Sequence, residues 1–276
     1  MMSNYGVGKW KVTTIDCGWH IGNLVNLTPG RNDYPVKLPY LAFLLQDGEK
    51  NVLIDNGINE RFLIDGKAWG GCPADCGEKD LVNSLAKLGL KPSDIDVMLY
   101  THLHNDHAGN AQLFVNTPSY AQFDDYDNLL NPCYGETVRR DHDPEVIPFL
   151  KANPNLILLE GDMDLMEGVR VIKTPGHTRG SQSFVVNTTK GLRVFVGDLF
   201  HLRCMAFPTS TENMDYDGNP VKLEAYDAKV PCVASTLIYD HYALYRSYDK
   251  VRAYCPEWKP EYLICGHESC HLYGEI

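Results

Sequence analysis

The sequence predicts an α/β fold in which two β-sheets pack face to face and helices cover the outside. Short apolar runs of strand length recur along the chain, one amphipathic helical segment separates two early groups of strands, and a second lies near the end. This order is strands, helix, strands, and then strands and helix again. A two-layered β-sandwich with outer helices satisfies it, and two α/β halves are also compatible with it.

The length and composition are those of a globular chain with a large core. The chain has 276 residues, of which 44% are hydrophobic, and it contains neither a low-complexity segment nor a short-period repeat. α/β folds of this length are often single domains. We therefore expect one domain over residues 1–276.

The charge and the hydrophobic pattern exclude some classes of partner. A formal net charge of −11 argues against nucleic acids and anionic membranes, which attract basic surfaces. No apolar run approaches the ~20 residues that span a bilayer. Residues 1–10 lack the apolar core of a signal peptide. The sequence thus predicts a cytoplasmic protein without a membrane partner.

The nine cysteines are expected to be mostly free thiols, as is usual in a cytosolic chain. Cys72 and Cys76 form a close pair, but a zinc knuckle needs a second pair at matching spacing, and none is convincing. Loop thiols are one interpretation of Cys72 and Cys76, and a small redox or metal role is the other.

In the first half of the chain, strands are predicted where short apolar runs lie between turn residues. These runs are residues 11–16, 38–46, 51–55, 95–100 and 119–123. Asp47–Gly48 joins the second and third runs as a hairpin. Residues 17–37, rich in Gly, Pro and Asn, predict a loop, as do residues 58–78. Apolar residues at helical spacing over 80–90 predict an amphipathic helix.

In the second half, residues 124–153 mix charges with aromatic side chains and predict several helical pieces. Strands are predicted over residues 155–159, 169–173, 183–187, 192–196 and 261–265, with a turn at 162–164. Residues 204–231 show little periodicity, whereas 232–255 predict one long helix. Its aromatic side chains predict a core or subunit contact, so a homodimer is compatible with the sequence. They are Tyr239, His241, Tyr242, Tyr245 and Tyr248.

A dense group of metal-type side chains follows the strand predicted over residues 95–100. Four of six consecutive positions are His102, His104, Asp106 and His107. A neutral imidazole is a good metal ligand, and a carboxylate can act as a ligand or as a proton carrier. Because open α/β sheets place their sites at the carboxyl ends of strands, we expect these side chains to form part of a metal site.

Three later strand ends carry further side chains of the same kind. They are His177, Asp198 and His267, and each follows a glycine that lets the backbone turn sharply. Together the seven residues can make two metal positions. We expect the first to be held by His102, His104 and His177, the second by Asp106, His107 and His267, and Asp198 to bridge them. Two divalent ions ~3.5–4 Å apart can share a hydroxide at neutral pH.

The motifs of these segments resemble the metallo-β-lactamase superfamily. The resemblance is carried by His102-Leu-His104-Asn-Asp106-His107, Thr174-Pro175-Gly176-His177, Gly197-Asp198 and Gly266-His267, together with the hairpin Leu53-Ile54-Asp55-Asn56-Gly57. It spans about residues 38–270 and implies an αββα sandwich with the metals at one edge. Within the superfamily, the chain is most similar to the N-acyl-homoserine lactone hydrolases, which are quorum-quenching lactonases. The basis is residues 101–109, the chain length, the open region 29–38 and the position of His267.

The resemblance implies a metal-dependent hydrolase acting on a small-molecule ester or lactone. Two divalent ions, zinc first and manganese, iron or cobalt as alternatives, would hold a bridging hydroxide that attacks the carbonyl of a cyclic ester. Asp106 is expected to carry the proton to the leaving alkoxide. Asp55 is expected to orient a ligand histidine, with an ordinary turn aspartate as the alternative.

One position departs from the lactonase pattern. Where those enzymes resemble one another in a tyrosine three residues after the bridging aspartate, this chain has His201. His201 either donates a hydrogen bond to an oxyanion or is a surface residue, and we take it with Asp106 as a catalytic candidate. Loop residues expected to line a substrate pocket are Trp19, His20, Phe62, Trp69, Phe200, Met205 and Phe207.

Three groups of rival functions remain open, and one of them is a metal-binding protein without catalysis, against which the complete ligand set and the proposed proton carrier argue. Another ester, a thioester, a β-lactam or a phosphodiester could be cleaved on the same scaffold. A di-iron redox protein is the rival of a different class, but that family resembles this motif with a glutamate where His104 stands. His104 therefore favours hydrolysis.

Overall fold

The computed structural model describes residues 8–31 and 33–276, and two β-sheets form its centre. The larger sheet has seven strands, in spatial order β4 (Ala74–Cys76), β1 (Lys11–Asn23), β2 (Pro35–Gln46), β3 (Asn51–Ile54), β5 (Val97–Leu99), β6 (Ser119–Gln122) and β7 (Leu156–Leu159). The smaller has five, in the order β14 (Leu263–Cys265), β11 (Gly191–Gly197), β10 (Gln182–Thr188), β9 (Val169–Lys173) and β8 (Met163–Met166).

Alternation of side chains along the strands places one apolar layer between the two sheets. On β2, Phe43 and Leu45 face the inner layer, whereas Ala42 and Leu44 pack on the opposite side of the sheet. Successive residues of a strand point to opposite faces, so both faces of β2 are covered. Phe43 meets Phe195 of β11 across the layer, with ring centroids 5.3 Å apart.

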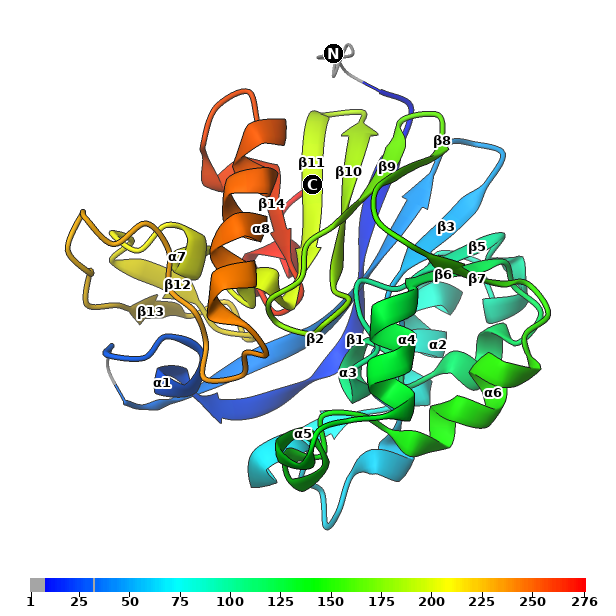
Figure 1. The fold of residues 1–276 in the computed structure, drawn as a ribbon, viewed down its shortest axis with the longest axis horizontal. Coiled ribbons are helices and arrows are strands. Elements are labelled where there is room, and N and C mark those ends of the chain that lie inside the picture. Colours follow the sequence, from blue (N-terminus) through cyan, green and yellow to red (C-terminus); the bar gives the residue numbers. More distant parts are fainter. Residues whose placement is uncertain (1–7, 32) are drawn as a thin grey trace.

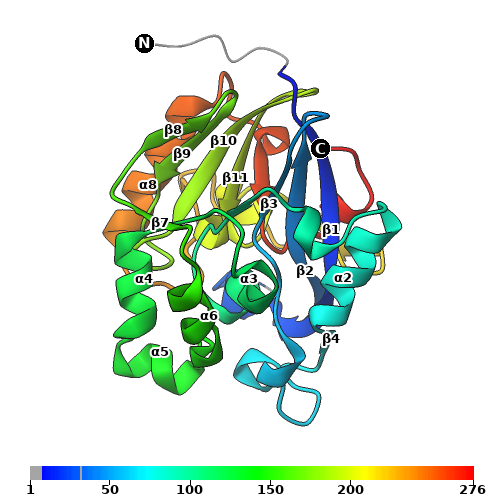
Figure 2. The same cartoon turned by 90° about the vertical axis from the view of Figure 1, so that its right-hand side faces the viewer.

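Helices cover the outer faces of both sheets. They are α1 (Leu24–Leu27), α2 (Glu78–Lys87), α3 (Asn105–Ala108), α4 (Phe123–Leu130), α5 (Tyr134–Arg139), α6 (Ile147–Ala152), α7 (Arg203–Ala206) and α8 (His241–Tyr254). Figure 1 shows α8 on one side of the molecule and α2, α4 and α6 on the other. In Figure 2 the strands of the two sheets lie between α8 and α2. The expected αββα sandwich is confirmed.

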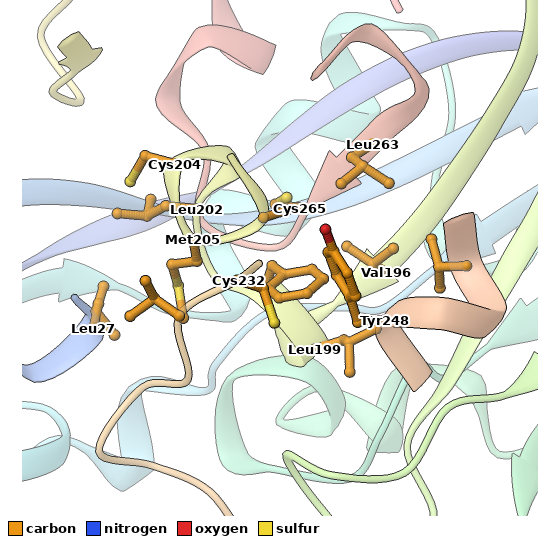
Figure 3. Packing of buried hydrophobic residues seen from close by; sticks show 14 of the residues in the cluster. Leu27, Val196, Leu199, Leu202, Cys204, Met205, Cys232, Tyr248, Leu263 and Cys265 are labelled. Carbon is orange, nitrogen blue, oxygen red and sulfur yellow. The ribbon is translucent and has the colours of Figure 1, made fainter. Parts of the chain in front are cut away.

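The outer layer beneath α8 is a cluster of buried apolar side chains. Tyr248 of α8 packs there with Val196 and Leu199 from the end of β11, and with Leu263 and Cys265 of β14 (Figure 3). This packing holds the carboxyl ends of β11 and β14 firmly in place, which matters because both strands lead into the candidate site.

The predicted end of the first strand and the predicted loop after it are wrong. β1 does not end at residue 16 but continues to Asn23, and β2 begins at Pro35, so residues 17–37 are only partly loop. Antiparallel pairing continues from Trp19↔Pro39 to Asn23↔Pro35, beyond a bulge that contains Gly18 (φ 97°). The Gly and Asn residues suggested a loop, but pairing with β2 keeps them extended.

Three further predictions need correction. The predicted turn at 162–164 contains the start of β8, which pairs antiparallel with β9. The helix predicted over 232–255 begins only at His241, because the Asp240 side chain caps it by accepting hydrogen bonds from two backbone N–H groups. Residues 204–231 contain a small two-stranded sheet of β12 (Glu212–Met214) and β13 (Pro220–Lys222), beside α7.

The remaining predicted strands and helices lie within a few residues of their expected places, and all nine cysteines are free, as expected. Within the described ranges, none of the helices is long and apolar enough to cross a membrane. Residues 1–7, which contributed to the expectation of a cytoplasmic protein, lie outside the described residues.

Candidate metal centre

Four chain segments that follow strands meet at one edge of the sandwich. His102 and His104 follow β5, Asp106 and His107 lie on α3, His177 follows β9, and Asp198 and His267 directly follow β11 and β14. All seven predicted ligand residues are thereby brought together. Six of the seven are buried, and Asp106 keeps a side-chain exposure of 17%.

The three side chains predicted to hold the first ion lie close together. Ligand-type atoms of His102, His104 and His177 lie within 4.8 Å of one another. His104 Nδ1 is 3.0 Å from His177 Nε2. Burial lowers the pKa of all three rings, so they are neutral and suited to bind a cation.

The second group also forms, and it carries most of the negative charge. Ligand-type atoms of Asp106, His107, Asp198 and His267 lie within 4.8 Å of one another. Burial alone lowers the pKa of His107, but the carboxylates of Asp198, Asp106 and Asp55 outweigh it and hold that pKa well above its usual range. The same field favours a cation at this position.

Asp198 lies between the two groups. Its Oδ2 is 3.7 Å from His177 Nε2 of the first group and 3.2 Å from His267 Nε2 of the second. Its Oδ1 is 3.3 Å from His107 Nε2. Asp198 therefore contacts histidines of both groups, and its bridging role stays a prediction.

Two glycines permit this close approach. A Cβ on Gly266 would lie 2.6 Å from Asp198 Oδ1, and a Cβ on Gly197 would lie 2.6 Å from Thr101 Oγ1. Gly197 also has a φ of 51°, in the left-handed region that favours glycine. Glycine at both positions lets the loops of the two sheets reach the same point.

The side chains present fit a pair of metal ions. His102 Nε2, His107 Nε2 and Asp198 Oδ1 are buried, and none of them makes a hydrogen bond with a described residue. Buried polar atoms are normally partnered, and several that are free at one point indicate a missing ligand. Imidazole nitrogens with two carboxylates are donors that zinc, iron, manganese and cobalt accept.

The outer nitrogen of most of these histidines is fixed by an acceptor. His107 Nδ1 is 2.8 Å from Asp55 Oδ2, His177 Nδ1 is 2.8 Å from the Leu237 carbonyl oxygen, and His267 Nδ1 is 2.8 Å from the Pro39 carbonyl oxygen. Each contact holds Nδ1 as a donor, so Nε2 is the nitrogen directed at the centre, as in metal-binding histidines.

His201 differs from this pattern, although the structure places it in the same centre and not on the surface. It is buried, and its Nε2 is 3.1 Å from Asp198 Oδ2. Its Nδ1 is buried and makes no hydrogen bond with a described residue. Burial lowers the pKa of His201 well below its usual range, so the ring carries one proton. A contact of 3.1 Å with a carboxylate oxygen places that proton on Nε2, directed into the centre.

Asp55 contacts His107 on the side of the ring that faces away from the centre, as expected. It is buried, and its carboxylate accepts hydrogen bonds from the Thr101 backbone N–H and from Thr101 Oγ1, both at 2.7 Å, in addition to His107 Nδ1. One carboxylate thus fixes the His107 ring and the start of the loop that carries His102 and His104.

We expect Asp55→Asn to weaken zinc binding about 10–100-fold, the usual effect of losing such an outer partner. The amide cannot accept all three bonds, because its NH₂ group must face either His107 Nδ1–H or a Thr101 donor. Asp55 has a φ of 59°, which asparagine tolerates, so backbone strain is not the cause. Competition with a chromophoric chelator measures the affinity. The exposed Asp65, with a φ of 51°, gives the matched control Asp65→Asn, and equal affinities of the two variants would contradict the role of Asp55.

A cavity opens onto the metal centre. Beside the ligand residues it is lined by His20, Leu27, Tyr40, Trp69, Asn105, Asp141, His201 and Leu237. Two of the predicted wall residues, His20 and Trp69, therefore line it. The His20 ring stacks on Tyr40, with centroids 4.8 Å apart.

The other predicted wall residues do not line this cavity. Phe200 and Met205 are buried in the cluster beneath α8, and Phe62 is buried against the outer face of the larger sheet. Phe207 stacks on Trp258, and Trp19 lines a separate hollow with Tyr216. These residues were aromatic or apolar within loops, but loops of this fold also cover the core.

The sequence analysis missed Tyr40, Asn105, Asp141 and the leucines of the cavity wall. Asn105 lies within the ligand motif, so its place beside the two ligand groups could have been inferred. Asp141 comes from the loop after α5 and binds Trp69 Nε1 through Oδ1 at 3.2 Å. Nothing in its local sequence distinguishes it from a solvated aspartate.

The chain matches one family model and is similar to individual proteins that bear a name. Residues 36–267 match the model of the metallo-beta-lactamase superfamily. N-acyl homoserine lactonase AiiA of Bacillus thuringiensis subsp. kurstaki is 33% identical over 170 residues, which are 59% of this chain and 62% of the relative. N-acyl homoserine lactonase AttM of Agrobacterium fabrum is 30% identical over 166 residues, 56% of this chain and 61% of the relative. These matches span less than two thirds of the relatives' length.

Solved structures share the fold over nearly the whole chain. An N-acyl homoserine lactone hydrolase with N-hexanoyl-L-homoserine bound at its catalytic metal centre superposes with a TM-score of 0.69 at 23% identity, covering 93% of this chain and 92% of that one. The dizinc quorum-quenching lactonase AidC gives a TM-score of 0.67 at 18% identity, covering 96% and 92%. At these identities the likeness establishes the fold.

Proposed function

This chain belongs to the metallo-beta-lactamase superfamily, and we propose that it is a metal-dependent hydrolase that opens a cyclic ester, a lactone. The observation that carries the proposal is a set of two ligand groups joined by Asp198, beside a cavity whose described wall has no lysine or arginine. The relatives named N-acyl homoserine lactonases support it.

The proposed ligand sets are those expected from the sequence. His102, His104 and His177 would hold one divalent ion, Asp106, His107 and His267 the other, and Asp198 both. Zinc suits these donors best, with manganese, iron and cobalt as alternatives. When bound, the ions would supply a hydroxide nucleophile at neutral pH and polarise the substrate carbonyl.

Asp106 is the proposed proton carrier. Its Oδ2 is 3.4 Å from His267 Nε2 and 3.7 Å from His107 Nε2, so it lies beside the second ligand group. Unlike Asp198 and Asp55, which are nearly fully buried, its side chain keeps 17% of its surface exposed to the cavity side. A partly exposed carboxylate can pass a proton to the alkoxide that leaves when the ester bond breaks.

His201 is the proposed hydrogen-bond donor to the carbonyl oxygen. Its single proton sits on Nε2, inside the centre, and its ring stacks on His267 with centroids 5.5 Å apart. A fixed N–H at this place can stabilise the negative charge that develops on the carbonyl oxygen as the nucleophile adds. His201 would thus assist at the substrate carbonyl, the role that the resemblance implies for the tyrosine of the similar lactonases.

The side chains of the cavity wall favour a substrate that has no negative group away from the metal positions. Among the described residues that line it, none is lysine or arginine, whereas Asp106, Asp141 and Asp198 are acidic. Away from the metal positions, the negative groups of a phosphodiester, of a β-lactam carboxylate or of glutathione would find no lysine or arginine in the described wall. A lactone carries no charge and meets no such penalty.

We expect the zinc-loaded protein to hydrolyse simple γ-lactones faster than a phosphodiester, a β-lactam or a glutathione thioester. The panel is run with zinc, manganese, cobalt and iron forms, and ring opening is followed by proton release. Protein stripped with a chelator is the control and should lose activity until metal is returned. If only a charged substrate is cleaved, the lactone proposal is refuted and the protein is the corresponding rival hydrolase. A stable redox-active iron centre without hydrolysis would favour the redox class.

A further inference from the structure

Asp125 is a buried carboxylate that the proposed reaction does not use. It lies on α4, the helix that follows β6, and it is 1% exposed. Among the described residues, neither the ligand groups nor the lining of the cavity on the metal centre includes it. Burying a carboxylate is costly unless its oxygens accept hydrogen bonds, so its partners show what it holds in place.

The carboxylate of Asp125 joins the two loops that carry the first ligand group. Its Oδ2 accepts a hydrogen bond from the backbone N–H of Leu103 at 2.6 Å, and Leu103 lies between the first two histidines of that group. Its Oδ1 accepts a hydrogen bond from the hydroxyl of Thr178, the residue after His177. The two bonds therefore connect all three histidines of the group through adjacent residues.

The loop after His177 also packs directly on the backbone of α4. A Cβ on Gly180 would lie 2.2 Å from the backbone nitrogen of Asp125, so only glycine allows this approach. Within the loop, the Thr178 backbone N–H donates to Ser181 Oγ at 2.9 Å, and the two hydroxyl oxygens lie 2.7 Å apart. The loop therefore has little freedom to move relative to Asp125.

The second ligand group has other supports. His107 Nδ1 is held by Asp55, and His267 Nδ1 is held by the carbonyl oxygen of Pro39. Neither contact involves Asp125. Loss of the Asp125 carboxylate would therefore release the two loops of the first group and leave these supports of the second group in place.

We propose that Asp125 is a positioning residue for the first metal position. By holding Leu103 and Thr178 with one carboxylate, it sets the spacing between the two loops that supply the three histidines. This inference rests on the ligand sets of the proposed function and gives each metal position its own outer support, Asp55 for the second and Asp125 for the first. Ligands on separate loops bind a metal tightly only when surrounding contacts hold those loops in position.

Two backgrounds that each keep one metal position test the proposal. His267→Ala removes a ligand of the second position, and His177→Ala removes a ligand of the first. In the His267→Ala background, Asp125→Ala should weaken zinc binding about 10–100-fold, the usual effect of losing an outer partner of metal ligands. In the His177→Ala background, the affinity should stay within about 2–3-fold, as for sites that do not interact. Competition with a chromophoric chelator measures each affinity and requires no hydrolysis.

Asp125→Asn separates lost positioning from a general loss of folding. Its amide oxygen can still accept from the Leu103 N–H, and its NH₂ group can donate to the Thr178 hydroxyl, which can turn its own proton to Ser181 Oγ. In the first position, its zinc affinity should therefore lie between those of wild type and Asp125→Ala, and the second position should not change. The same test thus remains available if the alanine variant folds poorly, and the melting temperature of each variant is measured.

Asp127→Ala is the matched control on the same helix. Asp127 contacts the same loop, through an ion pair with Arg179 at 2.9 Å, but both side chains are 35% exposed. Exposed ion pairs contribute little to stability. This variant should therefore keep the zinc affinity of both positions.

The outcomes distinguish the inference from the proposed function. An equal loss in both backgrounds would make Asp125 a residue of general stability, and unchanged affinity in both would remove its role, so either result overturns the inference. A His267→Ala background that takes up no zinc would overturn the first ligand set and the inference with it. A wild-type protein that binds two zinc ions but opens no lactone would refute only the proposed function.

Discussion

Replacing Asp106 by asparagine should lower kcat about 10²–10⁴-fold while most of the bound metal remains. The loss is that of a positioned proton carrier. Asparagine keeps an oxygen that can remain near His107 and His267, but it cannot take up and release a proton at neutral pH. Steady-state kinetics on a γ-lactone, together with metal analysis of the purified variant, measures both quantities.

A second variant separates proton transfer from metal binding. Asp198→Asn weakens the residue placed between both ligand groups, so it should lose metal and activity together. The exposed Asp75 provides the neutral control, Asp75→Asn. Turnover of Asp106→Asn equal to wild type would refute the proton-carrier role. A loss that follows the metal content would make Asp106 a ligand alone.

The metal-type residues could be found from the sequence because each has a local signal. His177, Asp198 and His267 each follow a glycine at the end of a short apolar run, and four such residues crowd into positions 102–107. The carboxyl ends of strands collect at one edge of a sheet, so a local pattern was enough to place distant residues together. The fold itself followed from the order of these runs and from the family resemblance.

The features that could not be predicted from the sequence depend on contacts between distant segments. The orientation of the Asn105 amide in the cavity wall depends on its Nδ2 bonds to the carbonyl oxygens of residues 140 and 141. In the same way, the extension of β1 to Asn23 depends on its pairing with β2. Aromatic residues in loops gave no means of separating cavity wall from core, which is why Phe200 and Met205 were assigned wrongly.

Replacing His201 by phenylalanine should lower kcat about 10²–10³-fold, the usual effect of removing one donor to an oxyanion. Phenylalanine preserves the ring that packs against His267 and His177 but has no N–H group. KM should change little, because the bond strengthens as charge develops on the carbonyl oxygen. The measurement is kcat and KM on a γ-lactone at matched zinc content.

His201→Gln is the informative partner of this variant, since its amide N–H can reach about as far as the imidazole Nε2–H. It should retain most of the activity that His201→Phe loses. His201→Tyr tests whether a tyrosine O–H, as found in the similar lactonases, can also donate this hydrogen bond.

His201 also forms a ligand-type group with His177 and Asp198, so a role as a metal ligand has to be separated from a role as a hydrogen-bond donor. Loss of one zinc ion in His201→Phe would make His201 a ligand. Full activity in that variant would make it a packing residue.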